Sequence, residues 1–335
     1  MKLDNDEDIT VIDKPPIKPK RRSSVSKKTS ARGKNAATND AAVDENASSK
    51  QSLLIYQIYF DPAQRPGLDA AFIPFDNAGQ TDPLLEFAVF ERLAADERVR
   101  LAPLWGALSW RFSEKTGLTG QALQQAIEKQ PGYDLYYCNP YPEYEALYTN
   151  GWQQGIASHP AFTELCAAVF EAAGLDPRAL VAVQPSSAFS ACNYFVASPA
   201  FWNSYLPWVR GVLDRARANL PASVLRVLDS GLSDPTNRHA GATYWPFIVE
   251  RLLPVFLQSA GQDLKVCKLE LPAAEAKLNS HLQRLREMKD VAHRTRSTWL
   301  HACWVNYRNL YLLQTLGRDW CKRYLPLING AEVEF

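Results

Sequence analysis

The sequence predicts an α/β protein built around a mainly parallel β-sheet, with a helical C-terminal extension. Short apolar runs typical of buried strands alternate with stretches of about 10–15 residues that have helical spacing, which is the pattern of βαβ units. Beyond Cys267 the chain changes to charged segments with helical periodicity. These observations predict a sandwich of helices around one sheet, followed by further helices.

The first 52 residues differ in composition from the rest of the chain. They contain no Trp, Tyr or Phe, although the protein has 9 Trp, 14 Tyr and 14 Phe. Because such a highly charged segment cannot bury enough apolar area to offset the entropy of ordering it, we expect it to be disordered. We therefore divide the chain into a basic tail at 1–52, an α/β domain at 53–262 and a helical extension at 263–335.

The overall charge and the missing motifs exclude several classes of protein. The chain has 37 Lys+Arg against 36 Asp+Glu, whereas a dedicated nucleic-acid-binding protein is usually basic as a whole. The first ten residues are acidic and polar, and no run reaches the roughly 18 apolar residues of a membrane-spanning helix. Six cysteines occur without a Cys-x-x-Cys pair, which favours free thiols in a reducing compartment. We expect a cytoplasmic protein without a nucleic-acid partner.

Two basic segments each leave two interpretations open. Nine basic and no acidic residues lie between Lys14 and Lys34, and twelve basic against five acidic residues lie between Lys265 and Arg323. The first segment either attaches to an anionic membrane surface or nucleic acid, or is a solvated extension. The second either lies on a membrane face or packs against the protein's own core.

Turn and capping residues set the expected element boundaries. The predicted strands cover residues 53–60, 71–77, 101–112, 133–140 and 189–196. The predicted helices cover residues 84–93, 119–129, 160–174, 199–213, 245–258, 273–290 and 298–316. Asp61-Pro62 ends the first strand, Thr119 starts a helix, and Gly174 follows the end of another. Residues 229–243 are rich in Asp, Ser, Gly, Pro, Asn and Thr, which predicts a mobile loop.

Polar residues recur just after the predicted strands. Ligands of open α/β sheets bind at the carboxyl ends of the strands, so these residues are candidates for a binding site. They are Asp61, Asp76, Asn77, Ser109, Arg111, Asn139 and Glu143. Asp and Asn are also ordinary turn residues, and it is their recurrence at one edge that favours a site.

Common nucleotide and metal motifs are missing. The chain contains no G-x-G-x-x-G, no Walker loop and no H-E-x-x-H. His159 precedes a proline and is more typical of a cap or a surface residue than of a catalyst. His239 lies in the predicted mobile loop, where it could meet a substrate.

Three segments resemble a bacterial group of polysaccharide glycosyltransferases. Residues 189–206 (FSACNYFVASPAFWNSYL) resemble its Asn-x-Phe-Val strand and the aromatic helix that follows, and residues 244–257 (YWPFIVERLLPVFL) resemble its Glu-Arg-Leu-Leu helix. Residues 105–112 (WGALSWRF) resemble its Gly-Leu-x-x-x-Arg-x-Phe segment. The match covers about residues 53–260. The resemblance implies a GT-A-like, Rossmann-type fold and a nucleotide-sugar donor. It also implies that the acceptor is a growing surface polysaccharide or a lipid-linked glycan. An enzyme with such an acceptor is expected to contact the inner membrane peripherally.

The resemblance assigns donor residues but leaves the metal open. Residues implied to contact or line the donor site are Asp76, Asn77, Ser109, Arg111 and Asn139. GT-A enzymes commonly hold Mg²⁺ or Mn²⁺ with an Asp-x-Asp after a central strand, whereas the comparable segment here, residues 137–140, reads Tyr-Cys-Asn-Pro. Either another residue holds the metal, or cationic and dipolar groups neutralise the diphosphate instead.

The resemblance places the second half of the site around Glu250. This residue would take the proton from the acceptor hydroxyl, unless it is a structural partner of Arg251. The other residues expected at the acceptor or in its closing loop are Glu143, Asn193, His239 and Arg251. The missing Asp-x-Asp keeps an alternative open, namely a non-catalytic binding or scaffold protein that retains the fold.

Overall fold

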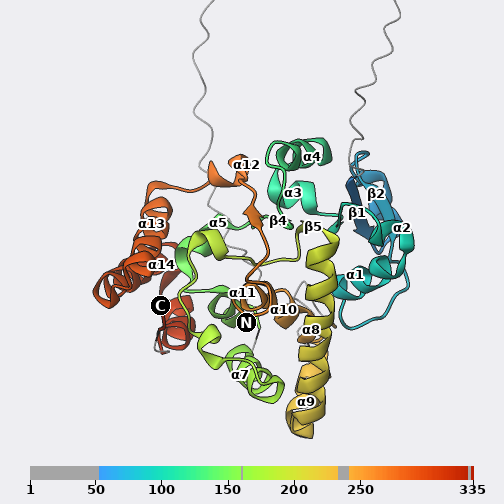
Figure 1. Cartoon of the computed structure of the whole chain (residues 1–335). Coiled ribbons are helices and arrows are strands. Elements are labelled where there is room, and N and C mark those ends of the chain that lie inside the picture. Colours follow the sequence, from blue (N-terminus) through green and yellow to red (C-terminus); the bar gives the residue numbers. More distant parts are fainter. Residues whose placement is uncertain (1–52, 160, 233–240, 331–332) are drawn as a thin grey trace, which may run out of the picture. The chain divides into compact units, whose positions relative to one another are not determined.

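A mixed six-stranded sheet forms the centre of the described part of the chain (Figure 1). The computed structural model describes residues 53–159, 161–232, 241–330 and 333–335. The strands are β1 (Leu53–Tyr59), β2 (Ile73–Asp76), β3 (Leu104–Ser109), β4 (Leu135–Tyr137), β5 (Phe195–Ala197) and β6 (Val266–Lys268), in the spatial order β2-β1-β3-β5-β4-β6. β5 is antiparallel to both neighbours, and the other pairs are parallel. The predicted mainly parallel sheet is confirmed, with one reversed strand.

Helices connect the strands at most of the predicted positions. The α-helices are α1 (Glu86–Ala95), α2 (Glu97–Arg100), α3 (Phe112–Thr116), α4 (Gly120–Glu128), α5 (Pro142–Leu147), α6 (Gly151–Ile156), α7 (Phe162–Ala173), α8 (Pro199–Asn219), α9 (Ala222–Asp229), α10 (Trp245–Val249), α11 (Leu252–Gln258), α12 (Pro272–Glu275), α13 (Ser280–Thr295) and α14 (Thr298–Asn329). Three short 3-10 helices are η1 (Pro62–Gly67), η2 (Pro177–Leu180) and η3 (Ser186–Ala188). The expected caps are confirmed, since Thr119 accepts a hydrogen bond from the N–H of Ala122 and Gly174 follows α7 with a φ of 68°.

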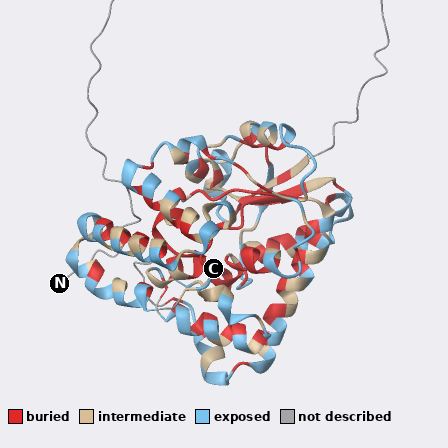
Figure 2. Cartoon of the chain, turned by 60° about the vertical axis from the view of Figure 1, so that its left-hand side comes forward, coloured by how far each residue is buried: buried red, intermediate tan, exposed pale blue. Residues whose placement is uncertain are grey.

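The sheet buries both of its faces. One face packs, largely through aromatic side chains, against α1, α7, α8, α10 and α11, and the other face packs against α3, α4 and α12. Figure 2 shows the buried residues along the strands and the inward sides of the helices. The Trp105 and Trp202 rings stack 4.1 Å apart, and the Trp202 indole donates to the carbonyl of Trp105 at 3.1 Å, which fixes α8 on β3.

The C-terminal helices pack on the same compact unit, which spans residues 52–335. α13 and α14 pack on each other, and α13 also contacts α5. The Trp304 indole donates to the carbonyl of Ala146 at 3.0 Å, and the buried Lys289 ammonium donates to the carbonyl of Tyr148 at 2.8 Å. The face of α14 that carries Trp304 therefore packs on the protein's own core, as one of the two interpretations expected. Among the described residues, no helix has both the length and the apolar character needed to cross a bilayer.

The structure corrects two sequence-based expectations, and two other predicted segments lie outside the described residues. The expected helical extension at 263–335 also contains the strand β6, which pairs with β4. Its three residues are too short to give a periodic pattern. The single helix expected at 245–258 is broken between α10 and α11. The proline ring of Pro254 clashes with a helical carbonyl four residues earlier, at Glu250, so the helix is interrupted there. The tail at 1–52 and loop positions 233–240 lie outside the described residues.

Candidate active site

Polar side chains meet at the carboxyl edge of the parallel strands. Ser109 is the last residue of β3, and Asn139 follows the end of β4. Because β5 runs in the opposite direction, its start brings Asn193 and Tyr194 to this edge as well. Ser109 Oγ and the Tyr194 hydroxyl lie 2.9 Å apart and are hydrogen-bonded. The strand-end reasoning therefore placed Ser109 and Asn139 correctly at one edge of the sheet.

Glu250 lies in the interruption between α10 and α11, close to this edge. Its side chain is 23% exposed. Burial raises the pKa of Glu250 to about 7, and the Glu86 carboxylate adds to the rise, while Arg251 and Lys115 oppose it. A carboxyl group with a pKa near 7 can accept and release a proton at neutral pH, which is the property of a general base.

Lys115 brings a positive charge from α3 to the same cluster. Its ammonium lies 5.9 Å from the ring centres of both Tyr141 and Tyr194, and it hydrogen-bonds Tyr141. Burial alone would lower the pKa of Lys115, but the neighbouring Tyr141, Cys192 and Glu250 together raise it. Lys115 therefore stays protonated at neutral pH and places a positive charge near Glu250 and the two tyrosines.

Glu86 reaches the cluster from a strained start of α1. The preceding residue, Leu85, has a φ of 50°, in the left-handed region that a leucine rarely occupies. Such a conformation costs about 1–3 kcal/mol and persists only when the surroundings impose it. Its ψ of −118° takes it outside the usual left-handed turn geometry as well. The surroundings therefore impose this start of α1, and the Glu86 carboxylate that follows it is close enough to Glu250 to raise its pKa.

Arg251 is buried next to Glu250 and hydrogen-bonds the groups around it. Its guanidinium donates to the carbonyl of Gly151 at 2.7 Å, to the carbonyl of Phe247 at 2.6 Å and to Gln154 Oε1 at 2.5 Å. Its Nη1 also lies 3.8 Å from Glu250 Oε2. These contacts occupy the fork of the guanidinium, so Arg251 positions Glu250 and has few donors left for a substrate.

Arg111 borders the cluster but is paired with a neighbour. It donates to both carboxylate oxygens of Glu114, at 2.9 and 2.6 Å. The hydrogen bond with Glu114 is the main reason that the pKa of Arg111 is raised, and Tyr141 and Tyr194 add to the effect. Arg111 therefore keeps its charge close to the two tyrosines of the cluster.

Asp76 and Asn77 lie apart from this cluster, at the end of the edge strand β2. Asp76 Oδ1 accepts the N–H of Ala78 at 2.9 Å, and Asn77 Oδ1 accepts a hydrogen bond from Arg92. β1 separates β2 from Ser109 and β3. The structure therefore gives these two predicted donor residues local turn and helix contacts and does not bring them to Glu250.

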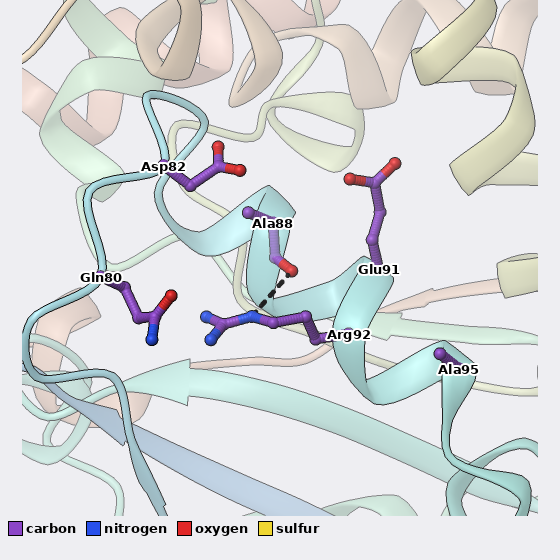
Figure 3. A pocket seen from close by; sticks show the side chains of 6 residues that line it. All are labelled: Gln80, Asp82, Ala88, Glu91, Arg92 and Ala95. Atoms are coloured by element: carbon purple, nitrogen blue, oxygen red, sulfur yellow. Dashed lines mark hydrogen bonds between the residues drawn. The ribbon is translucent and has the colours of Figure 1, made fainter.

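A shallow pocket of about 300 Å³ lies next to Asn77, along α1. Its lining residues are Gln80, Asp82, Ala88, Glu91, Arg92 and Ala95 (Figure 3). Figure 3 shows the Arg92 guanidinium beside Gln80, with its Nε donating back to the carbonyl of Ala88 at 3.4 Å. Glu91 forms an ion pair with Arg210 of α8. The pocket shares no lining residue with the Glu250 cluster.

The remaining predicted residues differ in their surroundings. Glu143 lies on α5 and is half-buried; burial raises the pKa of Tyr148 to about 12, and the negative charge of Glu143 adds to this rise. Asn193 and Asn139 are buried, and within the described residues neither side-chain oxygen has a hydrogen-bond partner. A buried amide oxygen without a partner is costly, so each is a candidate to accept a hydrogen bond from a ligand. His239 lies outside the described residues.

The charged groups at this edge do not fit a divalent metal. Among the described residues, no group of three His, Cys, Asp or Glu side chains could hold a metal ion. The two carboxylates of the cluster, Glu86 and Glu250, are accompanied by the cations Lys115 and Arg251. A divalent ion at this position would meet two positive charges, so these described residues do not fit one.

Sequence reasoning missed Lys115, Glu86 and Tyr194. The strand-end rule selects the first polar residues after each strand, whereas Lys115 comes six positions after Ser109, on the following helix. Glu86 belongs to a helix that precedes β3, and nothing in its local sequence marks it as a neighbour of Glu250. Tyr194 lies inside the segment that carries the resemblance, but its aromatic neighbours made it typical of a core residue.

Comparisons with known proteins yield one distant structural similarity. No protein-family model matches the chain, and no curated protein matches it. The solved apo structure of the bifunctional glycosyltransferase WbbM is similar to 65% of this chain, with a TM-score of 0.40 and 15% sequence identity. The match covers 45% of the WbbM chain, so this protein corresponds to less than half of its length.

Proposed function

We propose that the protein is a glycosyltransferase, which moves a sugar from a nucleotide-sugar donor to a growing surface polysaccharide or lipid-linked acceptor. The observation that carries the proposal is the Glu250 carboxyl group, whose pKa burial raises to about 7 beside Lys115 at the carboxyl edge of the sheet. A base that titrates near neutral pH and a buried cation are the two groups that sugar transfer from a diphosphate requires. The segments that resemble polysaccharide glycosyltransferases carry Ser109, Tyr194 and Glu250.

The proposed reaction is a single displacement at the anomeric carbon. Glu250 takes the proton from the acceptor hydroxyl while that oxygen forms a bond to the anomeric carbon. The bond from this carbon to the diphosphate oxygen breaks, and its electron pair leaves with the nucleoside diphosphate. Lys115 stabilises the negative charge that develops on the leaving group, and Arg111, paired with Glu114, would line the cleft.

The other predicted residues take binding roles in this proposal. Ser109 would contact the diphosphate, Asn139 would lie where the transferred sugar of the donor meets the acceptor, and Asp76 and Asn77 would lie toward the nucleoside end of the donor. Asn193, with its buried amide oxygen, and Glu143 would lie on the acceptor side, where His239 and residues 229–243 would close over the substrate. Arg251 would act by holding Glu250 in place.

Nucleotide binding tests the proposal directly. We expect at least one of UDP, GDP and CMP to raise the melting temperature, since a ligand at 100 times its Kd stabilises the folded state by about 2.7 kcal/mol. The increase should be the same with EDTA as with Mn²⁺. Lys115→Met should weaken binding roughly tenfold or more, because a charge-assisted contact to phosphate is worth about 1.5–3 kcal/mol. The exposed Lys129, at the end of α4, supplies the matched control Lys129→Met, which should bind like the wild type.

The same measurements separate the enzyme from a scaffold protein. If no nucleotide or nucleotide sugar changes the melting temperature, the glycosyltransferase proposal is wrong. Nucleotide binding without turnover of any nucleotide sugar, at every pH between 6 and 9, would favour the non-catalytic alternative that the missing Asp-x-Asp suggests.

A contact with an anionic membrane surface is the second part of the proposal. Trp299 and Leu310 on α14 are 74% and 61% exposed, and the exposed Arg318, Lys322 and Arg323 follow beyond a kink at Gly317, where φ is 81°. Exposed apolar side chains next to basic ones complement an anionic lipid surface. This arrangement supports a cytoplasmic enzyme that acts peripherally at the inner membrane.

Vesicle sedimentation tests the membrane contact. The protein should sediment with phosphatidylglycerol-rich vesicles and much less with phosphatidylcholine vesicles, and added salt should release it. A Trp299→Ala and Leu310→Ser double variant should lose most of this binding. Leu101 is 72% exposed after α2, so Leu101→Ser is the control and should sediment like the wild type. Equal sedimentation of both variants would contradict a role for α14.

A further inference from the structure

A second pocket, of about 820 Å³, lies where the main sheet meets the C-terminal helices. It is bounded by the carboxyl ends of β4 and β6 and by α5, α12 and α13, and its lining includes Asn139, Glu145, Lys268 and Arg286. Its position is distinct from the shallow pocket on α1, with which it shares no lining residue. Because β4 and β6 are parallel to β3, their ends lie at the same edge of the sheet as Ser109.

The wall of this pocket contains a buried polar atom without a partner. Asn139 is 3% exposed, and its Nδ2 donates to Glu145 Oε1 at 2.7 Å and to the carbonyl of Tyr141 at 3.0 Å. Within the described residues, its Oδ1 accepts no hydrogen bond. These two bonds fix the orientation of the amide, so Oδ1 is a pre-oriented acceptor that a ligand hydroxyl can satisfy.

The charges of the pocket indicate which ligands it can hold. Five carboxylates and three cations line it, and two of the cations, Lys268 and Arg286, are already paired. Lys268 donates to Glu145 and to the carbonyl of Ser186, and Arg286 donates to both oxygens of Glu275, each at 2.7 Å. A phosphate or carboxylate ligand would meet more negative than positive charge, although the exposed Arg294 also lines the pocket. A neutral polyhydroxyl ligand instead finds fixed carboxylate and amide acceptors around it.

The pocket is connected to the proposed base through two short links. Asn139 holds the carbonyl of Tyr141, whose side chain hydrogen-bonds Lys115, the cation beside Glu250. On α5, Tyr144 interacts electrostatically with Arg251, while the next residue, Glu145, lines the pocket. Asn139 and α5 therefore lie between the pocket and the residues around Glu250.

We propose that this pocket binds the neutral oligosaccharide portion of the acceptor, with its unpartnered Asn139 oxygen accepting a sugar hydroxyl. The volume accommodates several sugar units. This inference rests on the proposed transferase function for the role of the bound glycan, whereas the binding itself can be measured without turnover.

Calorimetry with the full-length protein tests the pocket. The probes are neutral tri- and tetrasaccharides of glucose, galactose, mannose and N-acetylglucosamine, together with a phosphorylated version of whichever binds best. Gln283 lines the pocket from α13 and is exposed, so Gln283→Trp places an indole in it without removing a charge. The adjacent Arg284 is also exposed but lies outside the pocket lining, and Arg284→Trp is the control. We expect at least one neutral oligosaccharide to bind, Gln283→Trp to weaken it at least tenfold, and Arg284→Trp to leave it within twofold.

A second variant tests the unpartnered oxygen. Asn139→Leu should weaken the same oligosaccharide about tenfold, with its melting temperature recorded to verify folding. Nucleotide binding to Gln283→Trp should equal that of the wild type.

The inference is overturned if no oligosaccharide binds, if Gln283→Trp binds as well as the wild type, or if the phosphorylated probe binds more tightly than the neutral one. If oligosaccharides bind but no nucleotide does, the pocket inference stands and the transferase proposal is wrong. If nucleotides bind but no oligosaccharide does, the pocket inference is wrong and the transferase proposal stands.

Discussion

Glu250→Gln should reduce sugar transfer by about 10²–10⁴-fold, the range that a positioned general base contributes. Glutamine keeps the shape of the side chain but cannot take the proton of the acceptor hydroxyl. Activity of the wild type should rise with pH through about 7, where the buried carboxyl group loses its proton, and then level off. The measurement is the pH profile of initial rates with a donor found by nucleotide screening, and donor binding by the variant should be unchanged.

The same substitution should stabilise the fold at alkaline pH. Below pH 4.5, Glu250 is protonated in both the folded and the unfolded chain. Between 4.5 and about 7 only the unfolded chain loses the proton, so the wild type loses stability as the pH rises. Glutamine removes this loss, and the variant should gain on the order of 2–3 kcal/mol in unfolding free energy at pH 8 and nothing at pH 4.

Glu91→Gln is the matched control for both measurements. Glu91 forms a half-buried ion pair with Arg210 and is not a member of the Glu250 cluster, so its loss should lower stability slightly and leave activity unchanged. If Glu250→Gln keeps activity within threefold of the wild type, Glu250 is not the base. If its stability at pH 8 falls, the carboxylate is stabilised by Arg251 and Lys115 more than burial destabilises it.

The sequence predicted the sheet and its helices well because their signals are local. Apolar runs and capping residues such as Thr119 and Gly174 depend on neighbours within a few positions. The sequence did not predict β6, because a three-residue strand is defined by its pairing with β4 and by nothing within itself. The interruption at Glu250 was visible in principle, since Pro254 lies four residues later in the chain.

The candidate site was only partly predictable for a related reason. Ser109 and Asn139 follow strands, so a rule about strand ends found them. Asp76 and Asn77 obey the same rule but belong to the edge strand, where the sheet order places them away from the cluster. The environment of Glu250 is formed by Glu86, Lys115 and Arg251, of which only Arg251 is near it in sequence. Electrostatic neighbours that come from three separate elements leave no pattern in a single sequence.

Arg251→Met should destabilise the protein by about 3–5 kcal/mol, because it leaves buried hydrogen-bond acceptors without a donor. The three acceptors are the carbonyls of Gly151 and Phe247 and the side chain of Gln154. Arg251→Lys should recover little, since a single ammonium cannot reach three acceptors in the geometry of a guanidinium fork. Urea denaturation provides the measurement. The exposed Arg226 of α9 gives the control Arg226→Met, with an expected change within about 0.5 kcal/mol.

A second readout separates positioning of Glu250 from simple structural support. Arg251 opposes the rise in the pKa of Glu250, so its removal should raise that pKa further. The activity of folded Arg251→Met should therefore rise at a higher pH than that of the wild type. A purely structural role would lower the melting temperature and leave the midpoint of the pH profile in place. An unchanged midpoint would show that Arg251 holds the α10–α11 interruption together without setting the charge state of the base.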